Sequence, residues 1–185
     1  LESNLMDEIN WVNNTVDWSY MDLRDAFLFD VDLRYADLRY ADLRDAYLGY
    51  ADLRGANLSN ANLMGAAVFY ANLSNADLSN ANLHDAGLFY SNLSNADLRD
   101  ANLIDANLAD ANLSNADLFD AYLDYAYLVD ANLNYANLNY ANLNYANLTG
   151  ADLTGANLND VFWYGTTCPD GTNSDNNGDT CENNL

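Results

Sequence analysis

The chain of 185 residues has the length of a single domain, and half of its residues are hydrophobic. Its six basic residues are all arginine and stand against 28 acidic residues, so the formal net charge is −22. A field of this sign repels nucleic acid and anionic membranes, and no stretch approaches the ~18 apolar residues of a membrane-spanning helix, so we expect neither nucleic-acid binding nor membrane insertion.

The first segment, residues 1–15, does not follow the repeat that begins after it. It carries four large apolar side chains, Leu5, Ile9, Trp11 and Val12. An array of repeats must cover the apolar columns that would otherwise end in water. The segment is therefore predicted to be an N-terminal cap, either a short helix or an irregular plug.

Residues 16–165 form an uninterrupted repeat of five residues in 30 copies. With the positions of each copy numbered one to five, position one is Ala in 25 copies and position three is Leu in 27. A period of five fits neither the 3.6-residue period of a helix nor the alternation of a simple strand. The pattern predicts short strands, each followed by a turn, with Ala and Leu both pointing inward.

Position five marks the turns. It contains only Tyr in ten copies, Asp in ten, Asn in five and Gly in five. Gly, Asn and Asp tolerate left-handed and turn conformations most readily. Position five is therefore predicted to be a corner, and each repeat one side of a polygon. Tyr does not belong to this group of turn residues, so another role is expected for it.

The runs ADLRYADLRY, ANLSNADLSN and ANLNYANLNY resemble the A-[DN]-L-x-x signature of the pentapeptide repeat protein family. The resemblance covers residues 16–165, about four-fifths of the chain. It implies an all-β fold, a right-handed quadrilateral parallel β-helix with four repeats per coil, so that 30 repeats give about seven and a half coils. Ala and Leu would stack in internal columns, and the other three positions would face solvent.

The ends of the array are distinct from its middle. Trp18 and Trp163 replace Leu in the first and last coils, and the polar tail of residues 166–185 holds Cys168 and Cys181. Two cysteines that bracket a polar loop predict a disulfide and an oxidising compartment. The chain starts without Met, which fits removal of a signal peptide, although a trimmed chain would start in the same way. We expect an exported protein (periplasmic, lumenal or extracellular) rather than a cytoplasmic one.

The sequence lacks the residue groups that catalysis needs. His84 is the one histidine and lies at an outward position, so no Ser–His–Asp or Cys–His group can be assembled. No glycine-rich phosphate loop and no zinc-binding spacing occurs. We therefore predict a protein without enzymatic activity and, apart from a possible calcium ion, without a cofactor.

Residues 20 positions apart are expected to lie on neighbouring coils. In this register, aromatic residues at positions two, four and five gather on one side. Exposed apolar patches mark interfaces, so we predict an interaction patch; the alternative is that stacked rings only stabilise the solenoid. The predicted patch comprises Phe27, Phe29, Tyr47, Tyr50, Phe69, Tyr70, Phe89 and Tyr90, with Ala67 and Gly87 as a low floor between the rings.

A second group of tyrosines surrounds the C-terminal coils. Large amphipathic rings of this kind are enriched at interfaces. The alternative is that they result from duplication of an ANLNY unit. The predicted second aromatic cluster comprises Tyr122, Tyr125, Tyr127, Tyr135, Tyr140 and Tyr145.

Two groups of polar residues are candidates for binding cations. Asp77, Asp97 and Asp117 are expected to form a ladder of opposed like charges, which is either well solvated or holds divalent cations. In the tail, alternate oxygen ligands and a Gly resemble a calcium loop, but the closing bidentate acid is missing, so a polar turn is the alternative. The possible calcium ligands are Asn173, Asp175, Asn177 and Asp179.

Three functions fit these observations. The first is an exported, rigid acidic rod that binds a protein partner or assembles with itself through the aromatic patch or through its ends. The family resemblance adds a second, because some members mimic DNA and bind DNA gyrase; those members are cytoplasmic and dimerise through an apolar C-terminal end. The third is an acidic wall that binds divalent cations. Both a monomer and an end-to-end filament fit the sequence.

Overall fold

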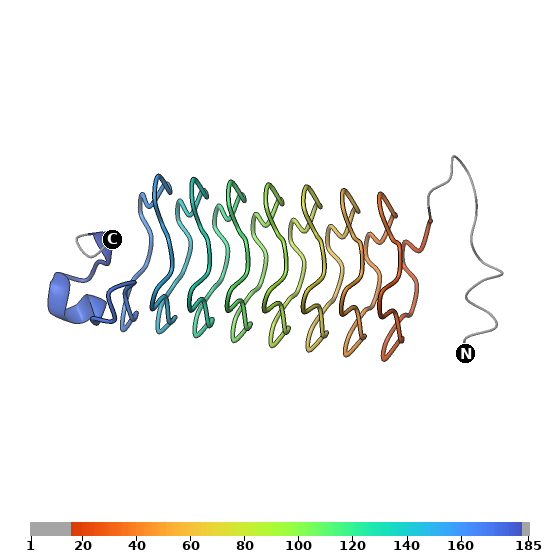
Figure 1. Cartoon of the computed structure of the whole chain (residues 1–185), viewed down its shortest axis with the longest axis horizontal. Helices are drawn as coiled ribbons and strands as arrows, with labels where there is room; N and C mark the ends of the chain where they lie inside the picture. The colour runs from red at the N-terminus through yellow and green to blue at the C-terminus, as the bar shows by residue number, and fades with distance from the viewer. Residues whose placement is uncertain (1–15, 183–185) are drawn as a thin grey trace.

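The computed structural model describes residues 16–182, and the predicted cap at residues 1–15 lies outside the described residues. The described backbone forms a stack of coils that follow one another in chain order along the long axis (Figure 1). Its regular elements are isolated β-bridges and one 3-10 helix, η2 (Ser174–Asn177). In residues 16–182 no helix is long and apolar enough to cross a membrane.

Each coil consists of four repeats, and each repeat forms one of its four sides. From Asp17 to Asn147, position two of each repeat pairs in parallel with the residue 20 positions later, as Asp17 does with Asp37. Beside each bridge, the amide of position three donates to the carbonyl of position two in the next coil, as Leu23 does to Asp42 at 2.7 Å. These bonds join each side of a coil to the same side of the neighbouring coils.

Leu at position three and Ala at position one fill the interior, as predicted. Between residues 36 and 148, every residue at these two positions is at most 2% exposed. Trp18 and Trp163 are 5% and 4% exposed near the two ends of the column. Ser91, which replaces an Ala, donates its hydroxyl to the carbonyl of Leu88 at 2.6 Å, the local bond expected of a buried serine. The core is one continuous column of aliphatic side chains.

Position five has a left-handed backbone in every repeat from residue 20 to residue 165, with φ between 54° and 73°. The prediction that this position is the corner is confirmed. Ten of these corners are Tyr, although a left-handed conformation costs a non-glycine residue about 1–2 kcal/mol. The tyrosines are therefore placed at corners against their backbone preference.

Asp and Asn at position two close the turns. In all 23 repeats that carry one of them, its side-chain oxygen accepts a hydrogen bond from the backbone amide of position four. Asn side chains also bond between coils, as Asn92 does to Asn72 and Asn112 to Asn92, each at 3.3 Å. Turn closure therefore explains why position two is so often Asp or Asn.

The repeat pattern continues for five residues beyond the boundary predicted at residue 165. Thr166 and Cys168 are buried at positions one and three, and Thr167 pairs with Asn147. A disulfide joins Cys168 to Cys181, with η2 between them in the chain (Figure 1). The sequence-based boundary falls short because Thr and Cys stand where the repeat otherwise has Ala and Leu.

The tail folds back onto the last coil. The amide of Thr166 donates to the hydroxyl of Ser174 at 3.0 Å, and that hydroxyl donates to the carbonyl of Trp163. The amide of Gly165 donates to the Asp175 carboxylate at 2.7 Å. These bonds hold the tail across the C-terminal end of the core.

Candidate protein-interaction surface

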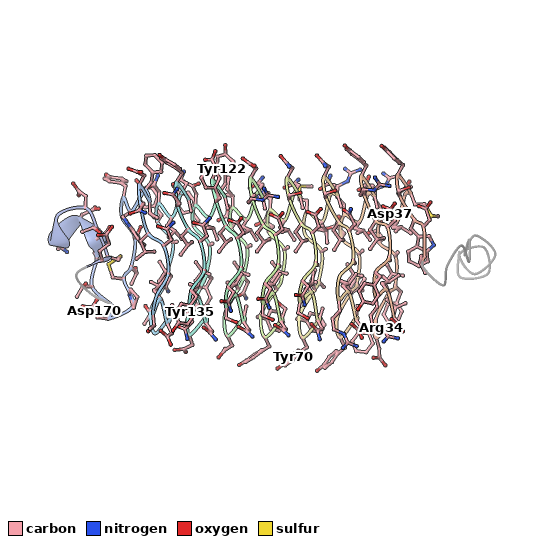
Figure 2. All side chains as sticks on the ribbon, turned by 90° about the horizontal axis from the view of Figure 1, so that it is seen from above. Arg34, Asp37, Tyr70, Tyr122, Tyr135 and Asp170 are labelled. Carbon is pink, nitrogen blue, oxygen red and sulfur yellow. A yellow bond between two sulfur atoms is a disulfide. The ribbon has the colours of Figure 1, made fainter. Side chains whose placement is uncertain are left out.

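The eight predicted patch residues lie together on one side of the solenoid. This side consists of the repeats that start at residues 26, 46, 66 and 86, one in each of four successive coils. Ring contacts connect all eight, with centroids 4.9–6.3 Å apart. Figure 2 shows Tyr70 at the edge of the coils. The aromatic patch is defined as Phe27, Phe29, Tyr47, Tyr50, Phe69, Tyr70, Phe89 and Tyr90.

Two parallel stacks form the centre of the aromatic patch. Tyr50, Tyr70 and Tyr90 stack with centroids 5.0 and 4.9 Å apart and with ring planes within 11° of parallel. Phe69 and Phe89 stack at 5.3 Å, and each meets the neighbouring Tyr ring edge to face. Aromatic pairs in these geometries contribute about 0.5–1.5 kcal/mol each beyond the burial of their area.

Gly49 makes room for the aromatic patch, although the sequence analysis did not single it out. A Cβ atom at this position would lie 2.7 Å from the ring of Phe69 and 3.3 Å from the ring of Phe29. The Phe69 ring therefore lies against the backbone of the preceding coil, where only glycine leaves space. The sequence does contain an indication of this role: position four of this side is Phe29, Gly49, Phe69 and Phe89 in successive coils, so Gly49 is the one residue of the row that is not Phe.

The aromatic patch stays exposed although its rings pack on one another. Phe27 is 70% exposed, Tyr47 52% and Tyr90 50%. The stacked rings of Phe69 and Phe89 are half-buried. A contiguous apolar surface of this kind is typical of a contact with another molecule.

The aromatic patch forms where the chain gives up its turn-closing hydrogen bonds. Position two on this side is Phe27, Tyr47, Ala67 and Gly87 in four successive coils, and none of them has the side-chain oxygen of Asp or Asn. Each missing bond costs about 0.5–1.5 kcal/mol, the same order as one ring pair. The ten ring contacts of the patch can therefore offset the four missing bonds, and it is the exposure of the rings that favours a role in recognition.

The side that carries the aromatic patch has no basic residue. The charged residues of its repeats from residue 26 to residue 150 are Asp30, Asp110 and Asp130, which lie at the two ends of the patch. The Asp110 carboxylate accepts a hydrogen bond from the Tyr90 hydroxyl and thereby raises the pKa of that hydroxyl. A partner that binds this side would therefore contact aromatic rings bordered by acidic residues.

All six arginines lie on the other three sides, and each pairs with the aspartate two residues before it. Arg24 donates from Nε and Nη2 to the two carboxylate oxygens of Asp22 at 2.7 and 2.6 Å. This pairing was not predicted from the sequence, although every Arg at position four follows an Asp at position two of the same repeat. The same fork occurs at Arg34, Arg39, Arg44, Arg54 and Arg99.

An arginine side chain, Arg99, lies within the predicted ladder of Asp77, Asp97 and Asp117. Arg99 Nε lies 2.8 Å from a carboxylate oxygen of Asp97 and 3.7 Å from one of Asp117. Asp117 also accepts a hydrogen bond from the Asn137 amide at 2.8 Å. Arg99 and the amide donor relieve the like-charge repulsion expected from the sequence, so the ladder does not need a divalent cation.

Replacing Arg24 with Gln is expected to return the pKa of Asp22 from about 2 toward its ordinary value of 3.8, because the side-chain hydrogen bond from Arg24 is the main cause of the lowering. The lowered pKa means that the pair stabilises the fold above pH 3.8 and that this contribution is lost as the pH falls through about 2. NMR titration of the Asp22 carboxyl carbon measures the pKa. Arg34→Gln is the matched control: it should shift the pKa of Asp32 and leave that of Asp22 near 2. An unchanged Asp22 pKa in Arg24→Gln would contradict the pairing.

The six tyrosines of the predicted second cluster lie around the four sides and do not form one surface. Within residues 16–182, Tyr125 and Tyr145 are the only two of the six whose rings are in contact, with centroids 4.9 Å apart. Figure 2 shows Tyr122 and Tyr135 at opposite edges of the molecule. Tyr125 and Tyr145 are one full coil apart, which brings their rings together; an interface role for the six tyrosines stays a prediction.

The proposed calcium ligands in the tail take part in hydrogen bonds that shape it. Asn173 caps the N-terminus of η2 by accepting from the amide of Asp175 at 2.9 Å, and Asp175 in turn accepts from Gly165. Asp179 is exposed and has a left-handed backbone with φ of 60°. The side chain of Asn177 lies outside the described part of the chain. Calcium binding by this loop stays a prediction.

Comparison with known proteins finds one family. The family model described as "Pentapeptide repeats" matches residues 17–48, 26–65, 41–85, 69–103, 96–134 and 121–160. No curated protein matches the chain.

Two solved structures illustrate the similarity. HetL, a pentapeptide repeat protein involved in regulating heterocyst differentiation in the cyanobacterium Nostoc sp. strain PCC 7120, is 39% identical with a TM-score of 0.51; the match covers 84% of this chain and 78% of HetL. QnrB1, a plasmid-mediated fluoroquinolone resistance protein, is 16% identical with a TM-score of 0.62 over 82% of this chain and 77% of its own. At that identity the likeness to QnrB1 concerns the fold alone.

Proposed function

Because the chain belongs to the pentapeptide repeat family, we propose that it is a rigid, non-enzymatic module that binds a protein partner. The repeats of this family form a right-handed quadrilateral β-helix, the fold predicted from the sequence. Such a solenoid holds outward side chains in fixed rows, because every coil is bonded to its neighbours. The function of such a solenoid then depends on which side chains each of its four sides exposes to a binding partner.

The observation that carries the proposal is the exposed aromatic patch on one side. Pairwise ring contacts connect eight side chains in four successive coils, and six of them are at least 45% exposed. Aromatic residues supply most of the binding energy in many protein interfaces, and removing one anchor typically costs about 2 kcal/mol or more. We therefore assign the partner contact to the aromatic patch.

The charge around the aromatic patch favours a cationic partner over a second copy of the chain. Two copies, each with a formal charge of −22, repel one another. The patch side has no arginine of its own and has acidic residues at both ends of the patch. Lys and Arg side chains of a partner would gain cation–π contacts with the ring faces, each about 0.5–2 kcal/mol.

The quadruple substitution Phe69→Ser, Tyr70→Asn, Phe89→Ser and Tyr90→Asn is expected to abolish partner binding while the solenoid remains folded. Ser and Asn already occupy the same repeat positions on other sides, so circular dichroism should stay that of the wild type. Wild type and variant are each used to capture binding proteins from an extract of the source cells, and the two sets of captured proteins are compared. A protein captured by the wild type and not by the variant is then purified and titrated against both. Loss of binding affinity by about 30-fold or more corresponds to one hot-spot residue.

The matched control removes a stacked Tyr pair from another side, Tyr125→Asn with Tyr145→Asn. This variant should retain the same partner with unchanged affinity. If the quadruple variant binds as the wild type does, the aromatic patch is a structural ladder and the proposed contact is wrong. Sedimentation of the wild type at increasing concentration tests the alternative of self-assembly, which would appear as particles larger than one chain.

We also propose that the protein is exported to an oxidising compartment. The support is the pairing of Cys168 with Cys181, whose Cα atoms lie 5.3 Å apart in the tail. Disulfides persist in the periplasm, lumenal spaces and outside cells, and are rare in the cytosol. Fractionation of the source cells locates the protein directly.

The DNA-mimic alternative is less well supported by the charge distribution. Arginine forks neutralise aspartates on three sides, and five of the six arginines lie between residues 24 and 54. A DNA mimic needs instead a continuous negative surface. Inhibition of DNA gyrase supercoiling by the purified protein at low micromolar concentration would favour this alternative over the partner-binding proposal.

A further inference from the structure

One corner of the solenoid brings the single histidine next to two carboxylates from successive coils. Asp85 and Asp105 are both position-five residues, 20 positions apart, and therefore occupy the same corner. His84 is the residue before Asp85 and projects from the same turn. The nitrogen of His84 and one oxygen from each aspartate all lie within 4.8 Å of one another.

The backbone fixes which nitrogen of His84 carries the hydrogen. Nδ1 lies 2.9 Å from the carbonyl oxygen of Ile104 in the next coil. A carbonyl oxygen only accepts, so Nδ1 must be the donor, and in the neutral ring Nε2 then has a lone pair. Histidines that bind metals usually donate their other ring N–H in this way, which holds the ring in place.

The lone pair of Nε2 faces the carboxylates. Nε2 lies 3.2 Å from an oxygen of Asp85, a separation at which both atoms can bind one metal ion. Asp105 adds a second carboxylate to the same corner. A metal ion shared by His84, Asp85 and Asp105 would bridge these atoms.

The surroundings increase the negative charge at this corner. In the first two coils of the same side, position four is Arg24 and then Arg44, and each guanidinium neutralises an aspartate; in the coil directly before His84 it is Met64. In the next coils that position is Ile104 and then Asp124, whose backbone carbonyl accepts a hydrogen bond from the amide of Asp105. The corner at His84 therefore has acidic neighbours without an arginine at positions 84, 104 or 124 of this side.

We propose that His84, Asp85 and Asp105 bind one divalent transition-metal ion of the zinc class. One imidazole nitrogen and two carboxylate oxygens are donors that zinc accepts, whereas calcium and magnesium prefer oxygen alone. Three protein ligands leave a fourth position of the tetrahedral ion for water or for a side chain of a partner. The proposal is independent of the aromatic patch, which lies on the adjacent side.

Titration of the full chain with Zn²⁺ by calorimetry, after removal of any affinity tag and treatment with a chelator, is expected to give one bound ion per chain. Because the chain has a single histidine, its ¹⁵N-imidazole NMR spectrum reports on His84 alone. The Nε2 signal should shift on addition of Zn²⁺ while Nδ1 keeps its hydrogen. Co²⁺ should give the visible absorption bands of a tetrahedral site.

His84→Gln and Asp105→Asn are each expected to weaken Zn²⁺ binding at least about tenfold. Asp45→Asn is the matched control, because Asp45 occupies the same corner two coils earlier, beside Arg44, and should leave the affinity unchanged. Circular dichroism verifies that all three variants fold. Binding that is equal in wild type and His84→Gln, or an imidazole spectrum that does not respond to Zn²⁺ and shows only a second proton on Nε2 at low pH, would overturn the proposal.

Discussion

Replacing Leu98 with Ala is expected to lower the free energy of unfolding by about 2–5 kcal/mol, the range for fully buried leucines. Leu98 is 0% exposed and belongs to the column that includes Leu78 and Leu118 in the neighbouring coils. The amide of Leu78 donates to the carbonyl of Asp97 at 2.7 Å, and such bonds fix the spacing of the coils. The walls therefore cannot collapse into the cavity that the substitution leaves. Urea unfolding followed by circular dichroism measures the loss.

Leu158→Ala is the control for this prediction. Leu158 lies in the last coil and is already 9% exposed, so solvent and local movement can relieve part of its cavity. In a solenoid each coil contacts only its neighbours, so a defect near the end should loosen that end and leave the middle folded. Equal losses at Leu98 and Leu158 would mean that the solenoid unfolds as one unit, contrary to the expectation.

Replacing Cys181 with Ser is expected to destabilise the C-terminal end by about 3 kcal/mol, the chain-entropy contribution of a cross-link that closes a loop of ~15 residues. The two cysteines are separated by 13 positions. Both cysteines are fully buried, so serine also places a hydroxyl in a buried site, and reduced wild-type protein, which keeps both side chains, isolates the effect of the lost bond. Hydrogen exchange followed by mass spectrometry should show residues 166–182 losing protection while residues 36–148 keep theirs.

Reduced wild-type protein is the control and should behave as the Cys181→Ser variant does. A thiol assay on native, unreduced protein should find no free thiol. Two reactive thiols would overturn the expected disulfide and weaken the proposal of export. Loss of protection across residues 36–148 would contradict a contribution restricted to the tail.

The core and the corners could be predicted because the residue type at a single repeat position determines whether that position is buried or forms a turn. Leu and Ala recur at fixed positions, so their inward direction follows from the period alone. The left-handed corners follow from Gly, Asn and Asp at position five, and Tyr takes the same conformation because its neighbours impose it. The aromatic patch was also found from the sequence, since a separation of one full coil places Tyr50, Tyr70 and Tyr90 in line.

What the sequence analysis missed depends on side-chain direction or on two residues acting together. The fork from Arg24 to Asp22 needs the side chains of positions two and four to point the same way, which periodicity does not state. The site at His84 depends on a hydrogen bond to Ile104 in another coil. Gly49 matters only because the Phe69 ring lies across it.

The coil of four repeats has a consequence for how such a chain changes during evolution. Insertion of a single repeat keeps Ala and Leu inward throughout, yet it moves every later repeat onto the next side. Placed between Tyr50 and Tyr70, it would cut the aromatic patch in two while the core stayed intact. Only gains or losses of four repeats, one whole coil, preserve the alignment of the sides. Duplication in smaller steps therefore makes new surfaces on an unchanged core.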